Sequence, residues 1–210
     1  MRRRQQPDDS AWLTQGQISA TPISAWPKVC PRILCDYELK ALKFIDRAAE
    51  GEKRKGTISF GYSSYGYDIR ISKHFKIFTN IRSSIIDPKK ITDDCFIDFV
   101  GKTCIIPPNS YALGESVERF RMPDNMIGVC LGKSTYARAG IAVNCTPIEP
   151  GFVGTIVVEI INATPLPAKI YAMEGIAQIL FFRGYKPQKD YARKGGKYQN
   201  QRGIVMPRVD

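Results

Sequence analysis

The chain has 210 residues and a mass of 23.6 kDa, which is enough for one sizeable hydrophobic core and slightly short for two. Hydrophobic residues make up 43% of the chain and charged residues 24%, a balance that excludes disordered, collagen-like and disulfide-scaffold proteins. The formal net charge of +11 indicates an anionic partner, and nucleic acid, a membrane surface or a small polyphosphate would each satisfy it.

The apolar stretches of the chain are short. The longest, residues 155–161 and 176–182, fall far short of the roughly 18 residues that span a bilayer. Met1–Arg4 is basic, but Gln5–Asp9 follows where a signal peptide needs a continuous apolar segment. The 6 cysteines form no C-x-x-C pair, a pattern typical of reduced, mostly buried thiols. We therefore expect a cytoplasmic protein without export or a membrane segment.

The N-terminal region has the composition of a tail. Residues 1–35 are rich in Arg, Gln, Pro and Ser, and four prolines interrupt any periodic pattern. We expect residues 1–30 to be poorly ordered and residues 31–210 to form a single domain.

One long helix is predicted directly after this tail. Asp36 is suited to cap it, and Gly51 stands where a C-terminal cap would end it. Apolar residues recur between them at near-helical spacing. These residues are Leu39, Leu42, Ile45 and Ala49.

From Thr57 onward, short apolar or alternating runs are separated by turn signals, which predicts an all-β barrel or sandwich. The turn signals stand at residues 87–88, 107–109, 123–125 and 165–167. No internal repeat or heptad run is present. Residues 183–203 are polar and basic with interleaved tyrosines, and we expect this segment to order over an anionic ligand.

The first candidate site is the segment 133–140, between predicted strands at 127–131 and 141–143. Ser134 is a natural N-cap, so the free backbone amides behind it would suit phosphate oxygens. Arg138 lies four residues later on the same face of a helical turn, and Lys133 adds a second positive charge. The alternative is a structural cap with solvated cations, which is the commoner meaning of an isolated S-x-x-x-R pattern.

The second candidate is Glu159, which lies in a predicted strand, residues 155–161, whose other members are apolar or small. Desolvation there should raise the pKa of its carboxyl toward neutrality. Such a group accepts a proton from water and returns it to a leaving group. The alternative is an edge-strand glutamate that faces solvent or pairs with a cation.

The third candidate lies in the C-terminal segment, where amide, phenol and ammonium groups would close over phosphates and a nucleoside. Its members are Tyr191, Lys197, Tyr198 and Gln201. The alternative is a solvated run of charges.

Zinc chemistry has little support in the sequence. A zinc deaminase needs a His or Cys followed by a catalytic Glu and a later P-C-x-x-C pair, and the chain contains no such pattern. The single histidine, His74, is far in sequence from any cysteine pair, and we expect it at the surface or on an edge strand. A His-based triad is excluded in the same way.

Several of these segments together resemble the dCTP deaminase family of the dUTPase superfamily. The resemblance covers about residues 58–210. The matching segments are Lys133–Gly140, Thr146–Pro150, Thr155–Glu159 and Lys197–Gln201, with further matches at residues 61–70, 105–110 and 165–171, all in the family's order.

The resemblance implies a mainly β fold, a distorted, jelly-roll-like β-barrel of the dUTPase type (β-clip) with one short N-terminal helix. It also implies a homotrimer that binds each nucleotide between subunits, magnesium bound with the triphosphate, no zinc, and feedback inhibition by dTTP. Residues 183–210 would close over the nucleotide. The implied nucleotide-binding residues are Lys133, Ser134, Thr135, Tyr136, Ala137, Arg138, Val157, Val158, Glu159, Gln178, Tyr191, Lys197 and Gln201.

The implied reaction is the zinc-independent hydrolysis of dCTP to dUTP and ammonia, which supplies dUTP for thymidylate synthesis. Glu159 matches the family's catalytic glutamate: it would deprotonate the water that attacks C4 of cytosine and then protonate the departing amine. Ser134 and Arg138 would stabilise the reaction centre.

Two other functions stay open. A dUTPase, or a bifunctional enzyme that also cleaves the triphosphate, would use an acidic residue such as Glu149 to position water. A buried carboxylate at Glu159 favours deamination, because a uracil pocket gains nothing from it. A non-catalytic nucleotide or nucleic-acid binding module is the third hypothesis, and we expect it least because several basic residues belong to the triphosphate motif itself.

Overall fold

The structure is a computed structural model, and it describes residues 31–81 and 84–209. The predicted N-terminal tail, residues 1–30, lies outside the described residues. Across the described ranges, no helix is both long and apolar enough to cross a membrane.

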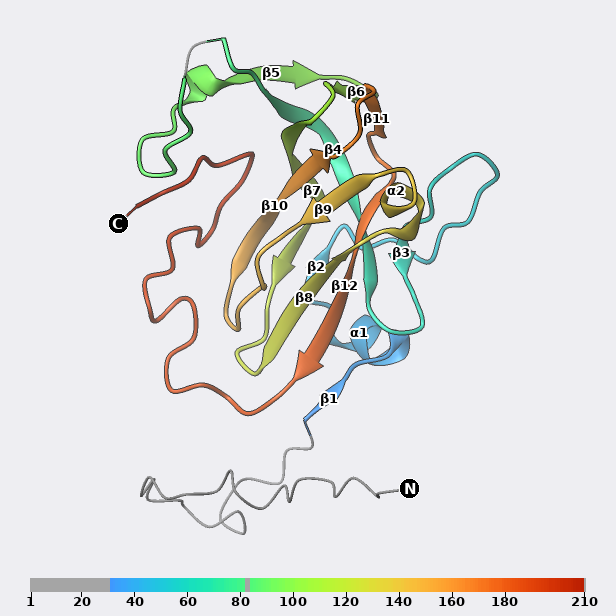
Figure 1. The fold of residues 1–210 in the computed structure, drawn as a ribbon. Helices are drawn as coiled ribbons and strands as arrows, with labels where there is room; N and C mark the ends of the chain where they lie inside the picture. The colour runs from blue at the N-terminus through green and yellow to red at the C-terminus, as the bar shows by residue number, and fades with distance from the viewer. Residues whose placement is uncertain (1–30, 82–83, 210) are drawn as a thin grey trace, which may run out of the picture.

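Most of the described strands form one curled antiparallel sheet (Figure 1). Its central path runs β8-β12-β4-β7-β10-β9, with shorter strands paired along β12, β4 and β7. The strands are β1 (Arg32–Ile33), β2 (Ile45–Asp46), β3 (Gly61–Tyr62), β4 (Tyr67–Phe78), β5 (Phe96–Val100), β7 (Ser110–Arg121), β8 (Met126–Gly132), β9 (Ile141–Asn144), β10 (Val153–Asn162) and β12 (Gly175–Arg183). A second sheet pairs β6 (Thr103–Ile106) with β11 (Ala168–Tyr171).

The two outer strands of the central path meet. β8 contacts β9, and an isolated bridge joins Gly128 of β8 to Ile148, beyond the end of β9. The sheet therefore curls round on itself, which confirms the prediction of a mainly β, barrel-like domain.

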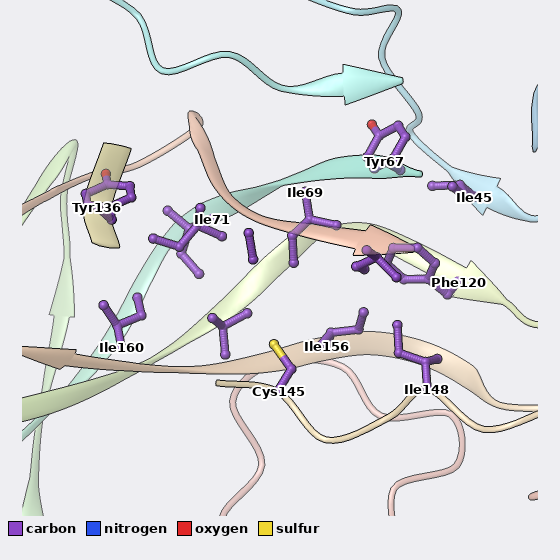
Figure 2. Packing of buried hydrophobic residues seen from close by; sticks show 14 of the residues in the cluster. Ile45, Tyr67, Ile69, Ile71, Phe120, Tyr136, Cys145, Ile148, Ile156 and Ile160 are labelled. Carbon is purple, nitrogen blue, oxygen red and sulfur yellow. The ribbon is translucent and has the colours of Figure 1, made fainter. Parts of the chain in front are cut away.

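Alternation along the strands places one face of this sheet inside the curl. On β10, Ile156, Val158 and Ile160 are 6%, 0% and 0% exposed, while Val157 and Glu159 between them are only half-buried. Figure 2 shows Ile156 and Ile160 facing Ile69 and Ile71 of β4 across the core. Each such aliphatic side chain stabilises the fold by about 1.5–3 kcal/mol relative to exposure.

The predicted N-terminal helix is real but half as long as expected. Helix α1 covers Asp36–Leu42 and begins after Cys35, whose backbone N–H and thiol donate to the Glu38 carboxylate. Asp36 is thus the first helical residue, and the predicted cap was wrong by one position. Lys43 ends the helix in the left-handed region (φ 47°), and Ile45 pairs with Phe120 of β7. Burying Phe44 and Ile45 in the barrel outweighs continuing the helical pattern.

Two further short helices occur in the described chain, η3 (Asp93–Cys95) before β5 and α2 (Ser134–Ala137) after β8. Beyond β12, residues 184–209 form an irregular segment. It passes beside β10, where Gln201 forms a parallel bridge with Gly154, and returns toward β5 (Figure 1).

Candidate active site

A cavity of about 610 Å³ lies beside β10, and the core residues Ile148, Phe152 and Ile156 line part of it. Its floor is formed by β10 and β7, where Glu159 pairs with Leu113 and Val157 pairs with Glu115. Paired residues of neighbouring strands share a face, so Val157, Glu159 and Leu113 point to the same side, and all three line the cavity.

Three segments that are far apart in the sequence form the walls of this cavity. Ile86, Pro88 and Ile91 come from the loop before η3, and Thr146–Glu149 and Phe152 come from the β9–β10 connection. The third wall is the C-terminal segment, which contributes Tyr191, Tyr198, Gln201, Val205 and Pro207. The cavity is therefore mainly apolar with a few polar groups, as is typical of a site for a small molecule.

Glu159 is one of two glutamates that line this cavity, the other being Glu149. Asn144, which lies opposite on β9, donates its amide Nδ2–H to Glu159 Oε2 at 3.2 Å. Burial raises the pKa of the Glu159 carboxyl above its ordinary value, and hydrogen bonds to its own backbone and to Asn144 offset part of that rise. The group can thus hold a proton more readily than a solvated carboxylate, as the sequence predicted.

Gln201 ties the C-terminal segment to β10. Its backbone C=O accepts the Thr155 N–H at 3.2 Å, and its side-chain Nε2 donates to the Thr155 C=O at 2.7 Å. Tyr191 also supports the segment, because its hydroxyl accepts the Tyr198 N–H at 3.0 Å and its ring packs edge-on against Phe152 at 5.7 Å. The structure therefore brings Val157, Glu159, Tyr191 and Gln201 together.

The segment 133–138 contributes no lining residue to this cavity among the described residues. Ser134 is the first residue of α2 rather than its cap, which is Lys133, so the predicted capping role of Ser134 was wrong. Ser134, Thr135, Ala137 and Arg138 are exposed. Lys133 instead forms an ion pair with Asp68 at 2.5 Å, with both side chains largely buried.

Tyr136 and Val158 have buried side chains. Tyr136 packs beside Ile71 in the core (Figure 2). Its hydroxyl accepts the Tyr171 N–H at 3.1 Å. Val158 is 0% exposed on the inner face of β10. Any contact between these two residues and a ligand must therefore come from their backbone.

Gln178 and Lys197 lie outside the cavity wall. Gln178 of β12 donates to Ser63 Oγ at 2.9 Å and pairs in the sheet with Asp68, the partner of Lys133. Lys197 is exposed and donates Nζ–H to the Arg208 C=O at 3.1 Å. The predicted residues thus form two groups on one chain: the cavity around Glu159, and a polar cluster of Lys133, Asp68 and Gln178 next to α2.

Sequence reasoning missed Asn144 and Asp68. Asn144 is a polar residue at the end of an apolar strand, and only the β9–β10 register reveals its partner. Asp68 is 65 residues away from Lys133 in the sequence, so no local pattern connects them. Asp68 does lie in the segment 61–70, which matches the family. For the loop carrying Ile86 and Pro88, the sequence predicted only a turn and not a wall of the cavity.

The described residues contain no group of three or more His, Cys, Asp or Glu side chains arranged to hold a metal ion. The five described cysteines are free thiols, of which Cys95, Cys104 and Cys145 are buried. His74 is exposed on β4, where it pairs with Val100 of β5, in agreement with its predicted surface position.

Comparison with known proteins assigns the family. A family described as dCTP deaminase-like matches residues 39–184. The chain belongs to the dCTP deaminase family. Over 168 residues it is 57% identical to the dCTP deaminase of Campylobacter concisus and 56% identical to that of Campylobacter jejuni, covering 80% of this chain and 90% of each relative.

A solved structure of the 2'-deoxycytidine 5'-triphosphate deaminase from Agrobacterium tumefaciens has the same fold. It matches with a TM-score of 0.56 at 17% identity over 74% of this chain. The match spans about half (49%) of that solved chain. The curled, mainly β sheet is therefore the fold of the family.

Proposed function

We propose that the chain hydrolyses dCTP to dUTP and ammonia without zinc. The observation that carries the proposal is Glu159, a half-buried carboxylate with a raised pKa in a cavity lined by apolar residues. The relatives named dCTP deaminase support the same substrate, since they align over 80% of the chain.

In the proposed reaction, Glu159 handles one proton twice. Its carboxylate takes a proton from the water that attacks C4 of cytosine, and its carboxylic acid then gives that proton to the departing amine. A raised pKa suits both steps, because the group must gain and lose a proton near neutral pH. Asn144 orients the carboxylate through Oε2 and leaves Oε1 to face the water.

The backbone of β10 is suited to reading the base. β9 pairs with β10 from Glu159 onward, and the C-terminal segment pairs with it up to Thr155. Between these two pairings, Val157 lines the cavity. We assign the hydrogen bonds to the edge of cytosine to the backbone around Val157, because backbone N–H and C=O groups are fixed donors and acceptors.

We assign the segment 133–138 to a neighbouring subunit's cavity, in a homotrimer with each nucleotide bound between chains. Exposure of Ser134 and Arg138 supports this, because neither faces the cavity of its own chain. Magnesium would arrive with the triphosphate and neutralise its charge. Its ligands would include phosphate oxygens, because Mg²⁺ in proteins is commonly bound through substrate phosphates. Inhibition by dTTP and a cytoplasmic location belong to the same proposal.

The test is incubation of purified, chelator-treated protein with dCTP and magnesium, with ammonia, dUTP, dUMP and pyrophosphate measured together. Ammonia and dUTP in equal amounts are expected. No ammonia from a folded protein would overturn the proposal.

A bifunctional activity has one specific observation in its favour. Glu149 lines the same cavity and accepts a contact from Lys194 Nζ at 3.4 Å, so a second carboxylate is available to position water on the triphosphate. Release of dUMP and pyrophosphate instead of dUTP in the same assay would identify this function.

A further inference from the structure

The C-terminal segment is held over the cavity by one carboxylate that does not itself line it. Glu115 of β7 accepts the Gly203 backbone N–H through Oε1 at 2.5 Å. We infer that Glu115 is a positioning residue that keeps the C-terminal segment closed over the nucleotide. This inference rests on the proposed function.

Gly203 lies between two places where the C-terminal segment is attached to the rest of the protein. Two residues before it, Gln201 is hydrogen-bonded to Thr155 at the cavity wall. Immediately after it, Ile204 and Met206 pack against Phe96 and Leu113 on the outer face of the sheet, while Val205 lines the cavity. Glu115 therefore holds the segment between its polar attachment and its apolar attachment.

Gly203 forms a bend in the C-terminal segment. Its φ of 75° lies in the left-handed region, which glycine adopts without a steric penalty but does not favour over other conformations. A hydrogen bond from its N–H to a carboxylate selects this conformation, because charge-assisted hydrogen bonds are stronger than neutral ones.

The sheet also fixes Glu115. It pairs with Val157, the residue assigned to the base, at the point where the β7–β10 register shifts. At this shift the side chain of Ser116 provides hydrogen bonds between the two strands and along β7. Its hydroxyl accepts the Ile156 N–H at 2.8 Å and donates to the Glu118 C=O at 2.7 Å. The hydrogen bond between Glu115 and Gly203, here called the latch, thus starts from β7, the strand whose Leu113 pairs with Glu159.

The test uses three variants of the full chain, Glu115→Ala, Glu115→Gln and Glu38→Ala. Glutamine keeps an acceptor oxygen but not the charge, so Glu115→Gln should lie between the wild type and Glu115→Ala in both readouts. Glu38→Ala is the matched control, because it removes another carboxylate that accepts a backbone N–H, at Cys35 and away from the cavity.

The first readout is trypsin cleavage of the Arg202–Gly203 bond without nucleotide, measured by mass spectrometry of the released C-terminal peptide. Arg202 is exposed beside the latch, and cleavage after the exposed Lys55 serves as an internal reference on the same molecule. Glu115→Ala should increase cleavage after Arg202 about tenfold relative to Lys55, the effect of losing one charge-assisted hydrogen bond. Unchanged relative cleavage would overturn the inference.

The second readout is steady-state deamination of dCTP. Glu115→Ala should raise KM about tenfold and change kcat by less than about threefold, because the open segment lowers the fraction of binding-competent protein. Faster cleavage with an unchanged KM would also overturn the positioning role. Absence of ammonia from the wild-type chain would instead contradict the proposed function, and the cleavage series would still decide whether Glu115 holds the segment.

Discussion

Asn144 donates a hydrogen bond to Glu159 at 3.2 Å from the strand that lies directly beside it. This contact stabilises the ionised carboxylate, whereas burial favours the protonated one. The protonation of Glu159 is thus set by two opposing effects, and each can be changed separately.

Removing the Asn144 amide should move the pH profile. In Asn144→Ala the pKa of Glu159 rises, because the hydrogen bond that favours the charged form is lost. The acidic limb of the plot of kcat/KM against pH, where activity falls as Glu159 becomes protonated, should shift to higher pH, and kcat should fall about tenfold at neutral pH. A profile that superimposes on the wild type would show that Asn144 does not act on Glu159.

Replacing Glu159 should stabilise the protein at high pH only. Because the folded pKa of Glu159 is raised, its contribution to stability is largest below the ordinary pKa and declines as the pH rises through the folded value. Glu159→Gln, which cannot ionise, should have the wild-type Tm at pH 4 and a higher Tm at pH 8. Calorimetry at the two pH values checks this, and an equal Tm at pH 8 would contradict the desolvation of Glu159.

Two inactive variants should complement each other if the site is shared between subunits. In the proposed homotrimer, Glu159→Gln and Arg138→Ala would each alter every site of their own assembly. In co-expressed mixed trimers, about a quarter of the sites would carry Glu159 from one chain and Arg138 from its neighbour. Ammonia release should therefore recover in the mixture, and a mixture as inactive as its components would place both residues in one chain's site.

The buried pair of Glu118 and Arg70 should dominate stability among the ion pairs. Glu118 is 0% exposed and accepts from Arg70 Nε at 2.8 Å, from the Arg70 N–H at 3.0 Å and from the Tyr67 hydroxyl at 3.1 Å. Glu118→Ala should cost about 3 kcal/mol in the free energy of unfolding, since it leaves a partly buried guanidinium unpaired.

The control is the solvent-exposed pair of Lys186 and Asp124, whose side chains are 49% and 46% exposed. Asp124→Ala should change the free energy of unfolding by about 0.5 kcal/mol or less. Equal losses in the two variants, measured by urea denaturation, would contradict the importance of burial.

The half-buried Glu159 and the fully buried Glu118 show what the sequence could and could not predict. Both lie in strand-like segments, yet only Glu159 was identified, because its neighbours are uniformly apolar and it matches a family motif. Glu118 is more deeply buried, but a hydrogen-bonded guanidinium 48 residues away in sequence compensates its charge. A local pattern does not reveal such a partner.

The fold was predictable where local patterns determine it. The prediction of the helix was wrong where a contact distant in sequence determines the structure. Alternating apolar runs and turn signals gave the mainly β architecture. The helix was predicted too long because its local spacing continues through Ile45, whereas the pairing of Ile45 with Phe120 of β7 ends it. The capping role of Ser134 was wrong because Lys133 already adopts the extended cap conformation.

The proton-transfer role of Glu159 is tested most directly by the rate of ammonia release from dCTP in Glu159→Gln beside the wild type, with nucleotide affinity measured on both. An amide of the same shape cannot accept the proton, so the rate should fall about a thousandfold while the Kd for dCTP stays near the wild-type value. A variant that releases ammonia at close to the wild-type rate would contradict the account.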